Sequence, residues 1–321
     1  MRVLVTGATG FVGQHLLRLL PSRRAELFGT FLQHDFADPP DRAQLLCCDL
    51  RHSDDVRSLV ADIRPNHVYH LAALSSVRDS FEESRAVYQA NFFGTLNLLE
   101  AVQAAQPGAR VLLVGSGHCY GKLKPSQMPI TEEQPLAPDS PYGVSKAAAD
   151  LLGSQFFQTY GLRVIRARPF NHTGPGQSTH FVCSDFARQV AAIDLGLATA
   201  TVKVGNIDAC RDFSDVRDVV RAYALLIKRG RPGEAYNVSS GRAVSLREIL
   251  GVLGSICSCE VRIEVEEKRI RCREADVLYG SNRKLKQATG WQPKYDLVLT
   301  LADLYMYWKQ ALQSERTTSA T

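Results

Sequence analysis

Short runs of β-branched and leucine residues alternate with amphipathic stretches through the first 170 residues of the chain. Such alternation of strand-like and helix-like segments predicts a parallel, doubly wound α/β sheet. The predicted strands are Arg2–Thr6, Glu26–Phe31, Gln44–Cys48, His67–Leu71, Arg110–Gly115 and Leu162–Arg168, and the predicted helices are Phe11–Leu20, Ser53–Ile63, Arg85–Ala105 and Tyr142–Tyr160. For the last helix, Asp139 or Ser140 is the expected cap and Pro141 the expected first-turn residue.

The alternation loosens after Pro169, where turns rich in glycine and proline separate further helical segments. This change predicts two domains, residues 1–170 with the main sheet and a smaller α/β lobe over residues 171–315, some of whose elements return to the sheet. The expected returning strand is Tyr236–Ser239, and the expected helices are Phe181–Leu195, Asp215–Lys228, Leu246–Ile256 and Leu299–Ala311.

Composition narrows the class of protein. With 45% hydrophobic and 22% charged residues, wholesale disorder is excluded. No apolar run approaches the roughly 18 residues that span a bilayer, and a strand begins at Arg2, so we expect a cytoplasmic protein without a membrane partner. The net charge of +5 comes without a lysine-rich block, so we expect no nucleic-acid partner. The cysteines lack paired or zinc-ligand spacing, which predicts reduced thiols and no metal.

A glycine-rich turn directly follows the first predicted strand and opens the first predicted helix. Gly7, Gly10 and Gly13 occur in that turn at a GxxGxxG spacing. Backbone N–H groups and a helix N-terminus then meet at one point, which is the arrangement that binds a pyrophosphate. The sequence therefore predicts a dinucleotide site at this turn.

The end of the second predicted strand bears on the choice of dinucleotide. An acidic residue there would hydrogen-bond a ribose 2′-hydroxyl and repel a 2′-phosphate. The chain instead continues from Thr30 through Phe31 and Leu32 to Gln33, with no carboxylate immediately after the strand. This favours NADP(H), with NAD(H) as the alternative.

Three residues form a candidate catalytic set. Tyr142 and Lys146 are four residues apart in a predicted helix and so share one face, while Ser116 follows the fifth predicted strand. Hydride reduction of a ketone leaves negative charge on oxygen, which must receive a proton. We predict that Tyr142 donates this proton, that Ser116 hydrogen-bonds the same oxygen, and that the Lys146 cation brings the Tyr142 pKa toward neutrality.

The glycine spacing and the Ser116, Tyr142, Lys146 set resemble the extended branch of the short-chain dehydrogenase/reductase superfamily, whose dinucleotide domain is a Rossmann fold. The resemblance implies that Tyr142 and Lys146 also contact the nicotinamide ribose. The other cofactor-binding residues that it implies are Gly7, Gly10, Phe11, Val12, Gly13, Thr30, Asp49, Leu50, Leu71, Ala72, Ala73, Asn91 and Pro169.

Two later segments, 168–177 and 211–218, are similar to the nucleotide-sugar branch of that superfamily, most of all to the GDP-4-dehydro-6-deoxy-D-mannose reductases. This resemblance implies NADPH-dependent reduction at C4 of a GDP-linked 4-keto-6-deoxy sugar, GDP-4-dehydro-6-deoxy-D-mannose, to give GDP-D-rhamnose. It also implies a homodimer formed through the Arg85–Ala105 and Tyr142–Tyr160 helices. The implied substrate-binding residues are Ser116, His118, Asn171, His180, Val182, Lys203, Arg211, Arg271 and Glu274. Arginine forks suit the paired oxygens of a diphosphate.

Related activities remain as alternatives. Dehydratases of this branch carry an acid/base pair ending in glutamate after the catalytic hydroxyl, and the chain has Gly117 and His118 there, which disfavours dehydration. GDP-L-fucose synthases epimerise C3 and C5 before reducing C4, and His118, Cys119 and His180 could carry the protons for that chemistry. A 4-epimerase with tightly held NAD and a non-catalytic dinucleotide sensor are the other two alternatives.

Overall fold

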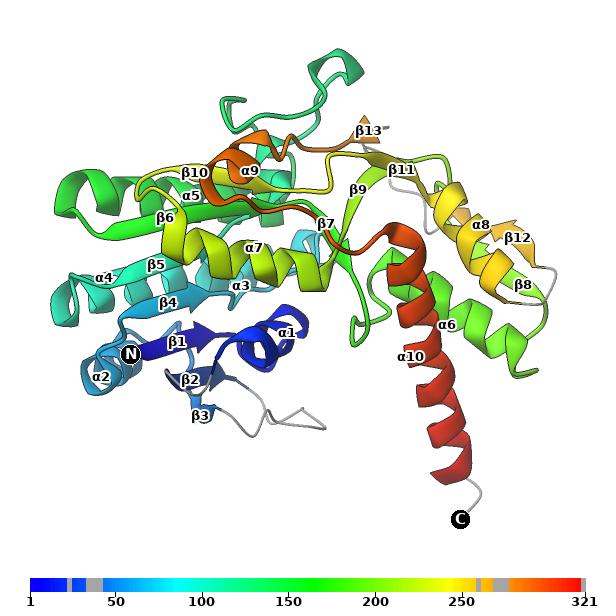
Figure 1. The fold of residues 1–321 in the computed structure, drawn as a ribbon, viewed down its shortest axis with the longest axis horizontal. Helices are drawn as coiled ribbons and strands as arrows, with labels where there is room; N and C mark the ends of the chain where they lie inside the picture. Colours follow the sequence, from blue (N-terminus) through cyan, green and yellow to red (C-terminus); the bar gives the residue numbers. More distant parts are fainter. Residues whose placement is uncertain (22–24, 33–42, 258–260, 268–276, 319–321) are drawn as a thin grey trace.

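A parallel sheet forms the centre of the computed structural model, which describes residues 1–21, 25–32, 43–257, 261–267 and 277–318. Its strands are β1 (Arg2–Thr6), β2 (Glu26–Phe31), β3 (Gln44–Cys47), β4 (His67–His70), β5 (Arg110–Val114), β6 (Arg163–Pro169) and β10 (Ala235–Val238). They lie in the order β10-β6-β5-β4-β1-β2-β3 (Figure 1), so the strand order reverses between β1 and β4. The predicted doubly wound sheet is confirmed, and its ligand crevice is expected at that reversal.

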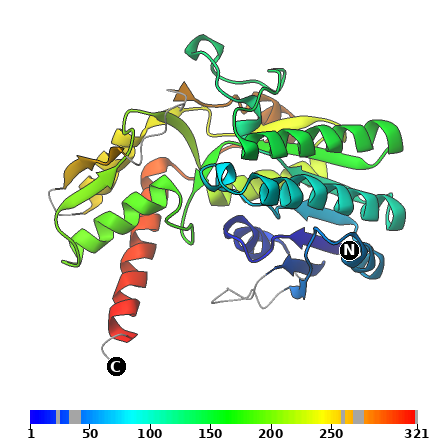
Figure 2. The ribbon, with the colours of Figure 1, turned by 180° about the vertical axis from the view of Figure 1, so that it is seen from behind.

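Helices cover both faces of this sheet. They are α1 (Phe11–Leu19), α2 (Ser53–Ile63), α4 (Gly94–Ala105), α5 (Pro141–Tyr160) and α7 (Val216–Arg229). On β1, Val3 and Val5 belong to the core under α1 and α7, whereas Leu4 belongs to the core on the opposite face, under α2 and α4. Figure 2 shows α4 and α5 side by side on that opposite face. The period of two along the strand therefore builds two separate cores on one sheet.

Helix α5, which carries Tyr142 and Lys146, has a capping residue at each end. The Ser140 hydroxyl accepts a hydrogen bond from the Gly143 N–H at 3.1 Å, and Pro141 occupies the first turn. Gly161 ends the helix in the left-handed conformation with φ of 71°. The predicted cap at Ser140 is confirmed, and the start of α5 is fixed at the residue before Tyr142.

The predicted helix Arg85–Ala105 is confirmed as a run of helical residues, but one turn of it is π-helical. It divides into α3 (Ser84–Tyr88), a π-helical turn η2 (Gln89–Phe93) and α4. The Thr95 hydroxyl donates to the Asn91 carbonyl at 2.6 Å, and His70 of β4 contacts the same hydroxyl. A side chain that inserts into the backbone ladder in this way accounts for the wider turn.

The chain beyond residue 170 contributes to both parts of the molecule. Strand β10 pairs with β6, so the predicted return of Tyr236–Ser239 to the sheet is confirmed within one residue. The other elements are β7 (Asn171–Thr173), α6 (Val182–Asp194), β8 (Thr201–Val204), β9 (Cys210–Asp215), β11 (Ala243–Ser245), α8 (Leu246–Ile256), β12 (Arg262–Val265), β13 (Val277–Leu278), α9 (Arg283–Thr289) and α10 (Leu297–Thr318). Helices α6, α8 and α10 share a core of their own. The domain division near residue 170 stays a prediction.

One prediction about the cysteines is wrong. Cys257 is disulfide-bonded and is therefore not a reduced thiol. Cys47, Cys48, Cys119, Cys183 and Cys210 are free thiols. None of the described helices is long and apolar enough to cross a membrane.

Candidate active site

The glycine-rich turn lies between β1 and α1 and packs tightly against its neighbours. Gly7 has φ of 66°, and its N–H donates to the Thr30 hydroxyl of β2 at 3.4 Å. A Cβ on Gly7 would lie 2.9 Å from the Ala72 backbone, and one on Gly13 would lie 2.3 Å from the Gly7 carbonyl oxygen. Only glycines leave the backbone this compact, so the turn fits the pyrophosphate of a dinucleotide at the N-terminus of α1.

A buried hydrogen-bond chain fixes the strand ends beside this turn. The Thr95 hydroxyl donates to a carbonyl, so the Nε2–H of His70 donates to Thr95 at 2.9 Å, and Nδ1 accepts from the Thr6 hydroxyl at 2.7 Å. Thr6 in turn accepts from the Ala72 N–H at 3.3 Å. Burial lowers the pKa of His70 to about 3, so the ring stays neutral. The segment Leu71–Ala73 thus starts from a fixed position next to Gly7.

The remaining predicted cofactor residues on this side have distinct surroundings. Asp49 follows β3 and accepts a forked hydrogen bond from Arg51, which lowers the pKa of its carboxyl. Leu50 is buried in the core under α2 and α4. The Asn91 amide exchanges hydrogen bonds with the backbone of Leu74 and donates to the Ser145 hydroxyl. Asn91 therefore ties the loop after β4 to the catalytic helix.

The candidate catalytic set meets at the carboxyl end of β5. Ser116 follows β5 and caps the short helix η3 (Gly117–Tyr120), Tyr142 lies in the first turn of α5, and Lys146 lies one turn later. All three side chains are buried. The Tyr142 ring meets the His118 ring edge to face, with centroids 6.0 Å apart. The predicted grouping of a hydroxyl, a phenol and an ammonium is thus present in the structure.

Burial governs the protonation of Tyr142 in this set. Burial raises the pKa of Tyr142 to about 12, and the hydrogen bond with Ser116 only partly opposes it. The Lys146 ammonium donates to the Val114 carbonyl at 2.7 Å. The expectation that Lys146 lowers the Tyr142 pKa toward neutrality stays a prediction. A phenol that stays protonated at neutral pH is the form required of a proton donor.

In the segment after β6, Phe170 packs into a core, whereas His172 contacts the start of α1. Phe170 is 5% exposed and packs in a small core with Tyr120. The Phe170 ring therefore belongs to that core. Phe11, at the start of α1, stacks on His172 with ring centroids 6.2 Å apart and an interplanar angle of 6°. This stack joins the glycine-rich turn to strand β7.

Apart from Ser116 and His118, the predicted substrate residues that the structure describes lie beyond residue 170. In the parallel pair of β7 and β9, Asn171 is opposite Phe213, so Arg211 lies two residues earlier on the same face as Phe213. Arg211 is 8% exposed, and Nη1 donates to the Cys210 carbonyl. Lys203 of β8 is half-exposed and pairs with Glu266 at 3.2 Å.

His180 and Val182 lie at the start of α6, where His180 is exposed and Val182 half-buried. Arg271 and Glu274 lie outside the described residues.

Two residues next to the site were not predicted. Asp150 lies one turn beyond Lys146 on α5, and Arg168 precedes Pro169 on β6. Their side chains form a buried ion pair, with Arg168 Nη2 2.8 Å from Asp150 Oδ2. The spacing of four residues from Lys146 to Asp150 is the sequence signal that places Asp150 on the catalytic face of the helix.

Comparisons with known proteins agree with this geometry. Residues 4–304 match the sequence model of the family described as GDP-mannose 4,6 dehydratase. A GDP-6-deoxy-D-mannose reductase of Pseudomonas aeruginosa is 36% identical over 314 residues, which cover 98% of this chain and 99% of the relative.

Solved structures of similar proteins show the same fold. The structure of RMD from Pseudomonas aeruginosa complexed with NADPH has a TM-score of 0.84 and 37% identity, and the match covers 97% of this chain and 99% of that one. A Thermus thermophilus UDP-glucose 4-epimerase in complex with NAD has a TM-score of 0.87 and 30% identity, with 97% and 100% covered. Both relatives were therefore solved with a nicotinamide dinucleotide.

Proposed function

The chain belongs to the GDP-mannose 4,6 dehydratase family. Within this family, we propose that it is a reductase rather than a dehydratase. Its reaction is the NADPH-dependent reduction of the C4 keto group of GDP-4-dehydro-6-deoxy-D-mannose to GDP-D-rhamnose, with NADH as the less favoured cofactor. The observation that carries this proposal is the placement of Tyr142 beside Ser116 at the carboxyl end of β5, in a site that has Gly117 and His118 where a dehydratase needs its glutamate.

The residues of the chain divide the work of the reduction. The Gly7–Gly13 turn and the start of α1 hold the pyrophosphate of NADPH, which supplies the hydride for C4. Tyr142 gives its proton to the C4 oxygen as that oxygen gains charge, and Ser116 hydrogen-bonds the same oxygen. Lys146 holds the ribose near Tyr142, and solvent restores the Tyr142 proton. The ketone thereby gains one hydride and one proton.

Packing supports the absence of dehydratase chemistry. A Cβ on Gly117 would lie 3.1 Å from the Phe170 ring, so a larger side chain there would require Phe170 to move. His118 occupies the next position, where the dehydratases have glutamate. The site therefore contains no carboxylate at either position to remove the C5 proton of a hexose.

Burial also argues against an epimerase that uses Cys119. The Cys119 side chain is 0% exposed, and burial raises the pKa of its thiol to about 12. A thiol with that pKa does not exchange protons with a sugar carbon near pH 7. His118 and His180 remain as the residues to test for C3 or C5 epimerisation.

A substrate panel tests the proposed function. With NADPH present, GDP-4-keto-6-deoxymannose should be reduced with equimolar NADPH consumption, and GDP-mannose should give no product. Conversion of GDP-mannose to its 4-keto-6-deoxy form would show a dehydratase, and interconversion of C4 epimers without NADPH consumption would show a 4-epimerase. NADPH binding without turnover of any of these sugars would indicate a sensor.

Arg211 is proposed to bind the substrate diphosphate, together with Asn171 from the paired strand. Arg211→Lys keeps the charge but loses the fork, so the KM for the GDP-sugar should rise about tenfold, with kcat and the KM for NADPH nearly constant. Steady-state kinetics measure this change. Arg247→Lys is the control, because Arg247 is an exposed arginine of the same lobe paired with Asp208. An unchanged KM in Arg211→Lys would remove Arg211 from the substrate site.

The rate should depend on the charge of Lys146. Burial lowers the pKa of Lys146 to about 8, so its ammonium loses a proton above pH 8. We expect kcat/KM to fall about tenfold per pH unit above pH 8, since Tyr142 is still protonated there. Lys146→Arg should be slower but have a flat profile from pH 7 to 10, because arginine keeps its charge. A fall of equal size in that variant would assign the titration to another group.

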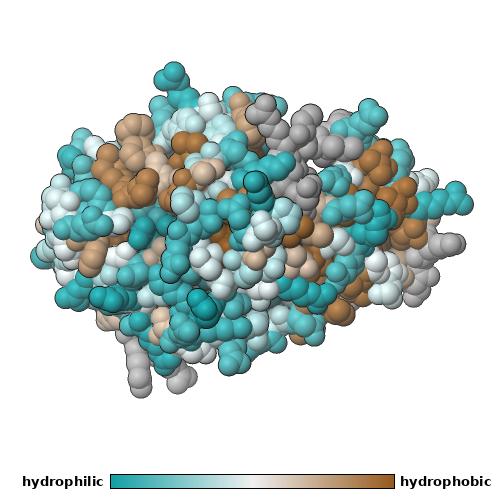
Figure 3. All heavy atoms as spheres, turned by 90° about the horizontal axis from the view of Figure 1, so that it is seen from above, coloured by the Kyte–Doolittle hydropathy of each residue, from teal (hydrophilic) through white to brown (hydrophobic). Residues whose placement is uncertain are grey.

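We also propose a homodimer, in a cytosolic protein that draws on soluble NADPH. Leu151 and Tyr160 of α5 are 59% and 53% exposed, and Phe93 of the adjoining π-turn is 51% exposed. Figure 3 shows hydrophobic side chains gathered at the end of the molecule where α5 lies in Figure 1. Exposed apolar patches of this kind often mark an interface between chains. Sedimentation velocity should give twice the chain mass, and a single-chain mass at micromolar concentration would refute the dimer.

A further inference from the structure

A buried ion pair connects the catalytic helix to the strand that ends beside the site. Arg168 of β6 donates to both carboxylate oxygens of Asp150, from Nε at 2.9 Å and from Nη2 at 2.8 Å. The Asp150 side chain is 0% exposed and the Arg168 side chain 6%. A forked guanidinium–carboxylate pair has a fixed geometry as well as charge. This contact therefore joins α5 to β6 through a pair of defined geometry.

The ion pair of Asp150 and Arg168 lies close to the catalytic residues on α5 and to the end of β6. Asp150 is one turn from Lys146 and two turns from Tyr142, so the three share one face of α5. Lys146 contacts the end of β5 through the Val114 carbonyl, and Asp150 contacts β6 one residue before Pro169. The helix is thus attached to the ends of two adjacent strands, and the second attachment precedes the segment that leads to Asn171.

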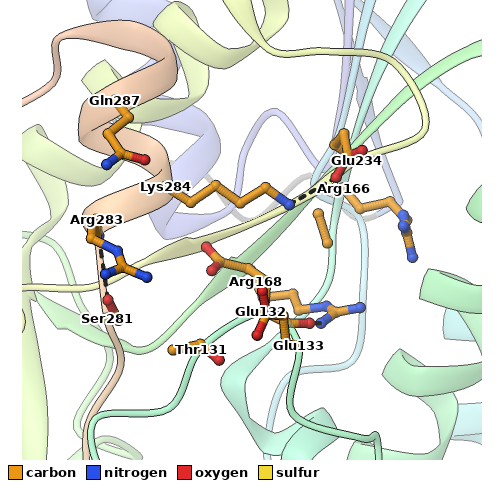
Figure 4. A pocket seen from close by; sticks show the side chains of 11 residues that line it. Thr131, Glu132, Glu133, Arg166, Arg168, Glu234, Ser281, Arg283, Lys284 and Gln287 are labelled. Atoms are coloured by element: carbon orange, nitrogen blue, oxygen red, sulfur yellow. Dashed lines mark hydrogen bonds and ion pairs between the residues drawn. The ribbon is translucent and has the colours of Figure 1, made fainter.

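Further contacts hold Arg168 on its other side. Its Nη1 donates to the Tyr120 hydroxyl at 2.9 Å, and its guanidinium carbon lies 5.2 Å from the centre of the Tyr120 ring. The Tyr120 hydroxyl donates to Asn237 of β10 at 2.7 Å. Figure 4 shows Arg168 beside Glu132 in the wall of a pocket of about 390 Å³ that opens between the 131–133 loop and α9. Solvent therefore approaches Arg168 from that pocket, while Asp150 stays shielded.

We propose that Asp150 and Arg168 are positioning residues, which keep Tyr142 on α5 at the correct distance from the Pro169–Asn171 segment. Neither touches the reacting atoms; they act through the elements they join. The proposal rests on the reductase function proposed above. A displacement of about 1 Å between reacting groups lowers the rate by about 100-fold. Loss of the fork should therefore lower the rate of the chemical step and leave both binding constants nearly constant.

The chain offers a matched control in Arg166. It donates from Nη1 to the same Asp150 carboxylate at 2.7 Å, and its side chain is 13% exposed. It lies two residues earlier on β6 and is also held by the Gly233 carbonyl at 2.8 Å. Arg166→Lys thus weakens an ion pair of similar burial farther from Pro169. A merely structural role for Asp150 predicts similar effects from both arginines.

The experiment compares Arg168→Lys with Arg166→Lys. Arg168→Lys should lower kcat about 10- to 100-fold, with the KM for the GDP-sugar and the Kd for NADPH within about twofold. Its kinetic isotope effect on kcat with NADPH deuterated at the transferred position should rise. Arg166→Lys should lower the melting temperature by a similar amount but change kcat by less than about twofold. Equal losses of kcat in the two variants would overturn the proposal.

Two further measurements keep the proposal testable. Fluorescence of bound NADPH reports the surroundings of its nicotinamide without any sugar, and it should change in Arg168→Lys but not in Arg166→Lys. An unchanged spectrum in Arg168→Lys would refute positioning, whereas failure of the wild type to reduce the GDP-sugar would refute only the proposed function. If Arg168→Lys does not fold, Tyr120→Phe removes one hydrogen bond of Arg168, together with the hydrogen bond from Tyr120 to Asn237. It should then change the fluorescence in the same direction, and no change would count against the proposal.

Discussion

Tyr142→Phe should lower kcat by about 10²- to 10⁴-fold, the range that a positioned proton donor contributes. The phenol is buried and stays protonated at neutral pH, so it can supply the proton that the C4 oxygen needs. Phenylalanine keeps the ring but has no proton to give. The KM for the GDP-sugar and the Kd for NADPH should stay within about twofold, because the lost contact acts mainly on the developing alkoxide. Steady-state kinetics with NADPH titrations measure all three constants.

Tyr223→Phe is the control for this substitution. Tyr223 is fully buried in the core under α1 and α7, and its hydroxyl has no hydrogen-bond partner among the described residues. Its removal should leave kcat constant and should not lower the melting temperature, since no hydrogen bond is lost. If Tyr142→Phe lost affinity and kcat to the same extent, Tyr142 would be a binding residue rather than the acid.

Gly13→Ala should have the second largest effect, on cofactor binding. The new methyl group would lie 2.3 Å from the Gly7 carbonyl oxygen and 2.6 Å from that of Ala8, so the turn must move. Overpacking of this kind costs about 1–3 kcal/mol of unfolding free energy. Since the moved atoms are those proposed to hold the pyrophosphate, the Kd for NADPH should rise about 10- to 100-fold. Fluorescence titration and chemical denaturation measure the two effects separately.

Gly251→Ala is the matched glycine substitution. Gly251 lies in α8, and a Cβ there would meet nothing within 4 Å. An alanine in an open helix position should raise the unfolding free energy by about 0.5–1 kcal/mol and leave NADPH binding constant. If Gly13→Ala left the Kd for NADPH unchanged, the dinucleotide would bind elsewhere.

The sequence predicted the elements that repeat a clear period. Spacing within one element, or between adjacent elements, predicted the strands of the main sheet and the glycine-rich turn. It also predicted the shared face of Tyr142 and Lys146. Strands β7, β8, β9, β11, β12 and β13 were not predicted, because they gain their stability from partners far away in the chain.

Other features of the site depend on burial and packing. The Tyr142 pKa depends on how completely the phenol is removed from water, which spacing along a helix does not specify. The inward direction of Phe170 depends on the space left by Gly117 and Gly280, residues distant from it in the chain. The ion pair of Asp150 and Arg168 joins residues 18 positions apart on different elements. Only the packed structure shows these relations.

One NMR measurement tests the central claim, simple reduction at C4, most directly. The purified protein is incubated with GDP-4-keto-6-deoxymannose and NADPH in deuterated water, and the product is examined by proton and carbon NMR. The account predicts GDP-D-rhamnose with only hydrogen at C3, C4 and C5, because hydride comes from NADPH and no carbon-bound proton is exchanged. Deuterium at C3 or C5 would contradict it and show an epimerising reductase.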